Sequence, residues 1–163
     1  SMKGTKCHKV VAQIRSRTYS VFAAMNEGSL YFFELQDTPY NTEHFINFLI
    51  QLFVHLANDG ITGAHLVMDN VRFHHNTGVQ ELVIANGHHL IFLAAYSPFM
   101  NPIEEMFHQW KTSIRRREPR NEDQLYDAVN ASSEDISEDN CRNYIRHMES
   151  YLFRCLNREV IES

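Results

Sequence analysis

Two acidic residues, Asp69 and Glu104, are the strongest candidates for chemistry in this sequence. Asp69 ends the apolar run AHLVMD, which is typical of a buried strand, and Glu104 follows the Asn-Pro-Ile segment that opens a later helix. In open α/β sheets, ligands collect where parallel strands end, so we expect the two carboxylates to meet there. With Asn70 beside Asp69, this group is rich in oxygen and favours Mg²⁺ or Mn²⁺ over Zn²⁺.

Glu104 also has a purely local explanation, as an acid in the first turn of a helix. Asn101 can cap that helix, Pro102 suits its first turn, and an acid at this end complements the helix dipole. The other elements of the chain therefore decide whether Glu104 is only a helix-terminal acid or also one arm of a metal site.

The first part of the chain predicts a hairpin followed by a helix. Residues 19–25 (YSVFAAM) and 30–35 (LYFFEL) are β-branched or aromatic runs separated by the turn signal NEGS. Residues 9–14 (KVVAQI) can add a third strand and extend the hairpin to a meander. Apolar residues recur at helical spacing over residues 41–56, so a helix is expected to pack on one face of the sheet.

The second part predicts strand, helix and strand, and then three more helices. The strand that ends at Asp69 is followed by the helical segment NTGVQELVIANG, which Gly87 stops, and by the strand HHLIFL. This order implies a right-handed crossover between parallel strands and hence a mixed sheet. The last three helices are expected over residues 103–117, 122–132 and 137–156.

Composition limits the class of protein. With 163 residues, of which 44% are hydrophobic, the chain fits one globular domain with a sizeable core. The net charge of −5 argues against a general nucleic-acid coat protein. Three cysteines without Cys-x-x-Cys spacing favour free thiols in a reducing compartment. Because no membrane-length apolar run and no signal segment is present, we expect no membrane partner and no secretion. The expected location is nuclear in a eukaryote and otherwise cytoplasmic.

Two motifs resemble the C-terminal half of the catalytic domain of mariner-like DDE transposases, a ribonuclease H-like nuclease family. The motifs are LVMDNVRFHHN and LIFLAAYSPFMNPIEEMF, with 34 residues between Asp69 and Glu104. They are similar to the family's strand ending in Asp-Asn with a nearby His, and to its strand leading into Tyr-Ser-Pro and Asn-Pro-Ile-Glu. The hairpin and first helix are also similar, so the resemblance covers residues 19–117. Phe107, where the family often has Trp, and LAAYSP, in place of Leu-Pro-Pro-Tyr-Ser-Pro, are departures expected to affect packing.

The resemblance implies a ribonuclease H-like mixed sheet flanked by helices, and two-metal catalysis with Mg²⁺ or Mn²⁺. Asp69 would be the second catalytic acid and Glu104 the third, both as metal ligands. The family's first acid lies on the strand before the hairpin, and we expect that strand and its acid to lie upstream of residue 1. The alternative is that the acid has been lost. Ser1 and Met2 look like an expression-vector remnant, which favours the upstream position and makes residues 1–163 the C-terminal part of one DDE transposase-like catalytic domain.

Several other polar residues can either lie beside the metals or have an ordinary structural role. By the resemblance, Asn70 and His74 lie beside the metals, and His108 shares a helix face with Glu104 one turn later. For His74 and His75 a surface or supporting role is the alternative. His88 and His89 begin a strand whose alternation sends one inward and one outward, which argues against a paired metal site.

A basic run follows Glu104 on the same predicted helix. Its residues can contact DNA phosphates, and a solvated helix end explains them equally well. The candidates are Lys111, Arg115, Arg116 and Arg117.

These features favour a metal-dependent DNA endonuclease and strand-transfer domain of a transposase, acting in DNA transposition and integration. Its partners would be transposon ends or target DNA, and a homodimer is compatible with this role. Because the first acid is absent, we expect the fragment itself to be inactive, which leaves its enzymatic status open. The alternative is a domesticated transposase domain that binds DNA or assembles proteins without cleavage. The acidic net charge favours that alternative, whereas the presence of both Asp69 and Glu104 favours the enzyme.

Overall fold

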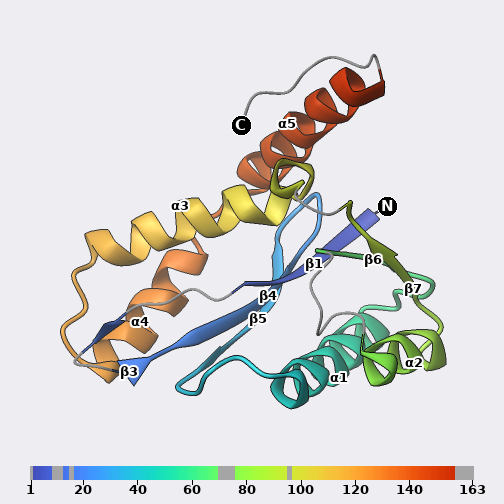
Figure 1. Ribbon diagram of the computed structural model, residues 1–163. Helices are drawn as coiled ribbons and strands as arrows, with labels where there is room; N and C mark the ends of the chain where they lie inside the picture. The colour runs from blue at the N-terminus through green and yellow to red at the C-terminus, as the bar shows by residue number, and fades with distance from the viewer. Residues whose placement is uncertain (1, 9–12, 15–16, 70–75, 95–96, 157–163) are drawn as a thin grey trace.

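A five-stranded mixed sheet with helices on both faces forms the centre of the computed structural model, which describes residues 2–8, 13–14, 17–69, 76–94 and 97–156 (Figure 1). The strand order is β5-β4-β1-β6-β7. β1 is antiparallel to β4 and parallel to β6, β4 is antiparallel to β5, and β6 is parallel to β7. The strands are β1 (Met2–His8), β4 (Ser20–Met25), β5 (Leu30–Gln36), β6 (His65–Met68) and β7 (His89–Phe92).

The position of β1 corrects the prediction that the first strand is missing. Met2–His8 lies at the centre of the sheet and pairs on both sides, with Gly4 opposite Met25 of β4 and level with Val67 of β6. The sequence MKGTKCH has neither the alternation nor the β-branched content of a strand, so propensity gave no signal. A central strand forms backbone hydrogen bonds on both edges, and this pairing outweighs its weak local preference.

The hairpin of β4 and β5 forms as the sequence predicts. Its turn is fixed by Asn26, whose side-chain oxygen accepts hydrogen bonds from the backbone N–H groups of Gly28 at 2.8 Å and Ser29 at 2.9 Å. All six residues of β4 are buried, because helices cover both faces of the sheet at this strand. Of the predicted strand at residues 9–14, only β2 (Gln13–Ile14) lies within the described residues, and it pairs with β3 (Arg17–Thr18) in a separate small hairpin.

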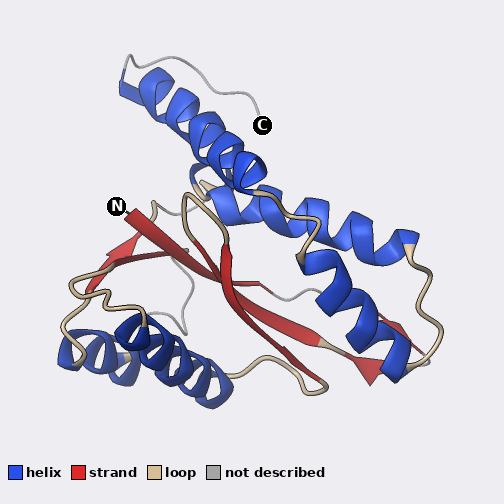
Figure 2. Cartoon of the chain, turned by 180° about the vertical axis from the view of Figure 1, so that it is seen from behind, coloured by secondary structure: helices blue, strands red, loops and turns tan. Residues whose placement is uncertain are grey.

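Helices α1 (Thr42–Asn58) and α2 (Thr77–Ala85) cover one face of the sheet (Figure 2). Asn41 caps α1 by accepting a hydrogen bond from the His44 N–H at 2.8 Å. The apolar stripe of α1 packs on Phe22 and Ala24 of β4 and on Leu66 and Met68 of β6. The chain leaves α2 through Gly87 at a φ of 76°, a conformation that favours glycine.

Helices α3 (Pro102–Arg116), α4 (Glu122–Ser133) and α5 (Glu138–Leu156) cover the opposite face, and a short 3₁₀ helix, η2 (Pro98–Met100), precedes them. Trp110 of α3 is 1% exposed and donates its indole N–H to the Ser132 hydroxyl of α4 at 2.9 Å. Its ring also meets Phe33 of β5 edge to face. This face of the sheet is therefore organised around α3, which carries Glu104 at its start.

The described helices include none that combines the length and the apolar character needed to cross a membrane.

Candidate active site at the carboxyl end of the sheet

Asp69 lies directly after β6, at the end of the sheet where the parallel strands β6 and β7 terminate; we call this the carboxyl end. The Asp69 carboxylate is half-buried and accepts a hydrogen bond from the side-chain amide of Asn101 at 2.8 Å. Asn101 itself is only 2% exposed. A buried amide that donates to a carboxylate fixes the position of that carboxylate and offsets part of its desolvation.

The same Asn101 begins the helix that carries Glu104. Its side-chain oxygen accepts from the Ile103 N–H at 3.4 Å, and its carbonyl accepts from the Glu104 N–H at 3.1 Å. Pro102 occupies the first helical position, where its missing N–H costs nothing. One residue therefore joins Asp69 to the first turn of α3, so that the two acids reach the same end of the sheet, as the strand order predicts.

Glu104 and Glu105 both lie in the first turn of α3, where acids complement the helix dipole. The side chain of Glu105 also contacts Nδ1 of His147 in α5. The local explanation of Glu104 as a helix-terminal acid is therefore confirmed, and Glu104 is half-buried three residues after the Asn101 cap.

α5 braces the start of α3, a feature that the sequence did not reveal. The Tyr144 hydroxyl donates to Gln109, and the Tyr151 ring packs on Phe99 of η2 with ring centroids 5.3 Å apart. Burial, with Cys141 and Glu105 nearby, raises the pKa of the Tyr144 phenol above its usual value. Helical periodicity predicts α5, but it cannot predict that Tyr144, His147 and Tyr151 contact η2 and α3.

The first acid of the family pattern has no counterpart in β1. The strand MKGTKCH contains no Asp or Glu. Continued by two residues, its register with β6 places Lys6 level with Asp69. Within the described part of the chain, no three His, Cys, Asp or Glu residues gather closely enough to hold a metal ion.

The supporting residues predicted from the sequence have different outcomes. Asn70 and His74 lie outside the described residues, so their predicted places beside the metals stay predictions. His108 is exposed on α3, one turn after Glu104. His88 is 6% exposed and its Nδ1 accepts from the Ala64 N–H at 3.1 Å, whereas His89 is exposed, so the predicted division of this pair between inside and outside is confirmed.

The basic run is exposed at the far end of α3. Arg115 and Arg116 are exposed in its last turn, and Lys111 is half-buried. Arg117 forms an exposed ion pair with Asp135, with the nitrogen and oxygen 3.2 Å apart. Arg117 is therefore partly neutralised, and the predicted phosphate contacts depend mainly on the other residues of the run.

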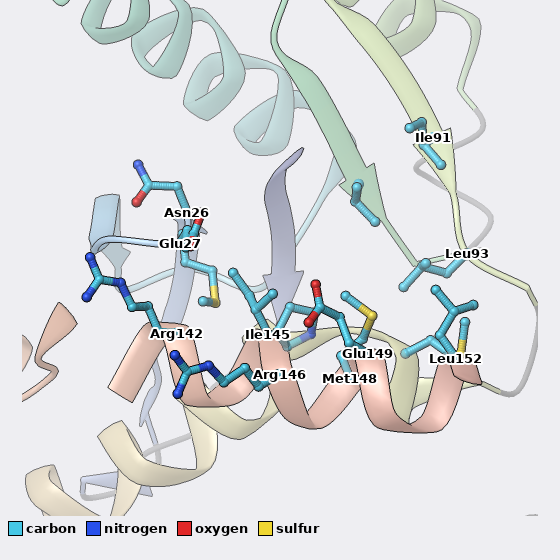
Figure 3. Close-up of a pocket in the computed structure, with 14 residues that line it drawn as sticks. Asn26, Glu27, Ile91, Leu93, Arg142, Ile145, Arg146, Met148, Glu149 and Leu152 are labelled. Atoms are coloured by element: carbon cyan, nitrogen blue, oxygen red, sulfur yellow. The ribbon is translucent and has the colours of Figure 1, made fainter. Parts of the chain in front are cut away.

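A pocket of about 430 Å³ lies beside the carboxyl end, between α5 and the sheet (Figure 3). Val67 and Ile91 contribute from the strands, and Met100 and Pro102 contribute from either side of Asn101. Ile145, Met148 and Leu152 of α5 form the opposite wall, with charged residues at the rim. The pocket is thus mainly apolar and borders the turn that holds Asp69.

Comparisons with known proteins identify the family. The family model described as DDE superfamily endonuclease matches residues 1–126. The chain belongs to this family. The match includes β1, Asp69 and Glu104, and it confirms the resemblance drawn from the two sequence motifs. A comparison with curated proteins gives no match.

Solved transposase structures share the fold of this DDE endonuclease domain. The catalytic domain of Mos1 mariner transposase superposes with a TM-score of 0.84 at 12% identity, covering 98% of this chain and 84% of that chain. The Mos1 catalytic domain with raltegravir and Mg gives a TM-score of 0.83 at 12% identity and covers 98% and 85% of the two chains. The Mos1 paired-end complex with the left transposon end gives 0.77 at 14% identity, over 91% of this chain and 46% of that chain. The ribonuclease H-like fold of a mariner transposase catalytic domain is thereby confirmed.

Proposed function

We propose that this DDE endonuclease domain acts on DNA phosphodiester bonds through a metal site at the carboxyl end, with Asp69 and Glu104 as ligands. The observation that carries the proposal is the single residue Asn101, which holds Asp69 by a 2.8 Å hydrogen bond and caps the helix that carries Glu104. Such a connection serves little purpose for two unrelated surface acids. It is what a pair of metal ligands requires, because ligands must be held in a fixed relation to each other.

The donor set fits a hard divalent cation. Both side chains offer carboxylate oxygens, and no described His or Cys joins them, so Mg²⁺ or Mn²⁺ suits the site better than Zn²⁺. When bound, such ions activate the attacking oxygen and stabilise the leaving oxygen of a phosphodiester. The residues of this chain would position the ions: Asn101 orients Asp69, and the His147 ion pair draws Glu105 toward α5. The solved structure of the Mos1 transposase catalytic domain with raltegravir and Mg supports this choice of metal.

The proposed substrate is DNA at transposon ends or at a target site. The family match and the relative bound to a transposon end support this substrate class. Arg115 and Arg116, exposed at the far end of α3, would bind the phosphates of flanking DNA without reading bases. In a eukaryote this activity would place the protein in the nucleus, and otherwise in the cytoplasm.

The experiment that tests this proposal is a cleavage assay with Mg²⁺ or Mn²⁺ on supercoiled DNA. Since β1 supplies no acid, residues 1–163 should bind metal weakly and cleave poorly, with any residual cleavage lost in Asp69→Asn. Robust cleavage that depends on Asp69 would show that two acids suffice and that the site is complete. Cleavage that Asp69→Asn leaves unchanged would remove the proposed site altogether.

A domesticated domain that binds DNA or assembles proteins without cleavage is the second candidate, and one observation favours it. β1, the central strand that pairs with β6, has the sequence MKGTKCH and contributes no carboxylate to a cation at the carboxyl end. The two candidates differ in the effect of Lys6→Asp. This substitution should tighten Mn²⁺ binding if the carboxyl end is a metal site, and should leave it unchanged if it is not.

A further inference from the structure

His65 and His89 lie side by side at the start of β6 and β7; we call these two residues the His pair. The parallel register places them directly opposite each other, so both side chains lie on the same face of the sheet. Both are exposed, and their rings are nearly parallel, with centroids 4.7 Å apart and planes at 21°. Asp69 follows His65 by four residues, about 13 Å along the strand at 3.3 Å per residue, so the His pair is separate from the carboxyl end.

The two strands that carry the His pair begin in the same way. Each His follows, by two residues, a glycine in the left-handed conformation, with a φ of 60° at Gly63 and of 76° at Gly87. Glycine adopts this conformation without the steric cost that a Cβ atom brings. The chain therefore turns into β6 and into β7 through equivalent steps, and each turn delivers one imidazole to the same row of the sheet.

Two hydrogen bonds join the strand starts beneath the His pair. The Ala64 carbonyl accepts from the His89 N–H at 2.8 Å, and the Ala64 N–H donates to Nδ1 of His88 at 3.1 Å. Ala64 is 5% exposed and His88 is 6% exposed, so both bonds are shielded from water. The backbone under the two rings is thus fixed before any ligand arrives, which lowers the entropic cost of binding one.

We propose that the His pair binds one divalent transition-metal ion, Cu²⁺, Ni²⁺ or Zn²⁺, through one imidazole nitrogen of each residue. Imidazole suits these ions, whereas Mg²⁺ and Mn²⁺ prefer carboxylate oxygens such as those at the carboxyl end. In the part of the chain that the structure describes, no third His, Cys, Asp or Glu completes the ligand set. Water therefore takes the other coordination positions, and Cu²⁺ should bind most tightly of the three.

The spacing of the rings suits a shared ion. A ring nitrogen lies about 1.1 Å from its ring centroid and about 2.0–2.1 Å from a bound ion, so two rings on one ion have centroids about 4.5 Å apart at a right angle and about 5.2 Å apart at a tetrahedral angle. The 4.7 Å in the His pair falls within this range. Only the ring planes must open from 21°, by rotation about χ2, a torsion with a broad preference in His. Binding thus requires no movement of either strand.

Isothermal titration of residues 1–163 with Ni²⁺ tests the site, at a pH of about 7.5 where most imidazoles are neutral. The tightest event should be one ion per chain. His65→Gln and His89→Gln should each raise its dissociation constant at least about tenfold, equivalent to about 1.4 kcal/mol. The double variant should bind no more weakly than either single one, because one imidazole alone has already lost the chelate. Two independent imidazoles would instead keep the wild-type constant in each single variant and lose half of the bound metal, which would overturn the proposal.

Cu²⁺ titration of the ¹⁵N-labelled protein locates the ion. Amide signals of His65 and His89 should broaden first, and His65→Gln should abolish this effect. The matched control is His44→Gln, which removes a half-buried imidazole of α1 and should leave the Ni²⁺ constant unchanged. Asp69→Asn should leave it unchanged as well, so the outcome is independent of the proposed catalysis. Far-UV circular dichroism verifies that each variant is folded. A Ni²⁺ constant that His44→Gln weakens as much as His65→Gln, or Cu²⁺ broadening centred on other residues, would refute the site.

Discussion

Asn101→Ala tests whether Asn101 holds Asp69 in place in addition to capping α3. It removes two interactions at once: the 2.8 Å hydrogen bond to Asp69, and the acceptor at the start of α3. Loss of a helix cap costs about 1 kcal/mol. Loss of a hydrogen bond to a charged group costs about 1.5–3 kcal/mol when the partner is left buried. The free energy of unfolding should therefore fall by about 2.5–4 kcal/mol.

Asn121→Ala is the matched control. Asn121 caps α4 by accepting from the Gln124 N–H at 2.8 Å, but it is exposed and has no carboxylate partner. Its removal should cost only the capping contribution of about 1 kcal/mol. The difference between the two variants isolates the bond to Asp69.

Urea unfolding followed by Trp110 fluorescence and by circular dichroism measures both losses. A second variant, Asn101→Asp, keeps the capping oxygen but places a carboxylate against Asp69, so it should be destabilised in the absence of metal and partly recovered by Mn²⁺. Equal destabilisation by Asn101→Ala and Asn121→Ala would refute the idea that Asn101 holds Asp69 in place. If Mn²⁺ leaves the free energy of unfolding of Asn101→Asp unchanged, there is no cation site at this position.

Two further predictions concern the surface and the pH dependence of stability. Replacing Arg115 and Arg116 with Gln should weaken binding to DNA of any sequence and lower the slope of log K against log salt by about two, since about 0.9 counterions are released per phosphate contact; identical slopes in salt titrations would remove these residues from the DNA surface. Burial, with His89 nearby, lowers the pKa of His88 below 6.5, so His88 is neutral in the folded state while the unfolded chain takes up a proton near pH 6.5. Stability should thus be complete above pH 6.5 and fall as the pH drops toward the lower folded pKa. Urea midpoints of His88→Gln should show a smaller fall than wild type, whereas His89→Gln should keep most of the fall, because burial is the larger cause of the lowered His88 pKa.

The helices and the hairpin could be predicted because their signals are local. α1 and α4 begin within one residue of their predicted starts, and the apolar period of α1 matches the residues that it buries. Asn26 sets the turn between β4 and β5 through its own backbone neighbours. Each of these features depends on residues only a few positions apart.

β1 could not be predicted because its stability comes from its neighbours. Its residues contain two lysines and a glycine, and only pairing with β4 and β6 makes Met2–His8 a strand. The packing of α5 on α3 could not be predicted from the sequence for the same reason. The contacts of Glu105 with His147 and of Gln109 with Tyr144 join residues 42 and 35 positions apart. The two motifs predicted Asp69 and Glu104 as candidate site residues. The hydrogen bond by which Asn101 links Asp69 to the start of α3 could be found only in the folded structure.

Mn²⁺ titration of the ¹⁵N-labelled protein shows whether Asp69 and Glu104 form a cation site. Paramagnetic broadening detects weak binding and locates it on the backbone, so it does not require a complete catalytic site. Signals of Asp69, of Leu93 directly after β7 and of Glu104 should broaden first, and this effect should be lost in both Asp69→Asn and Glu104→Gln. Broadening centred elsewhere, or unchanged in these two variants, would contradict it.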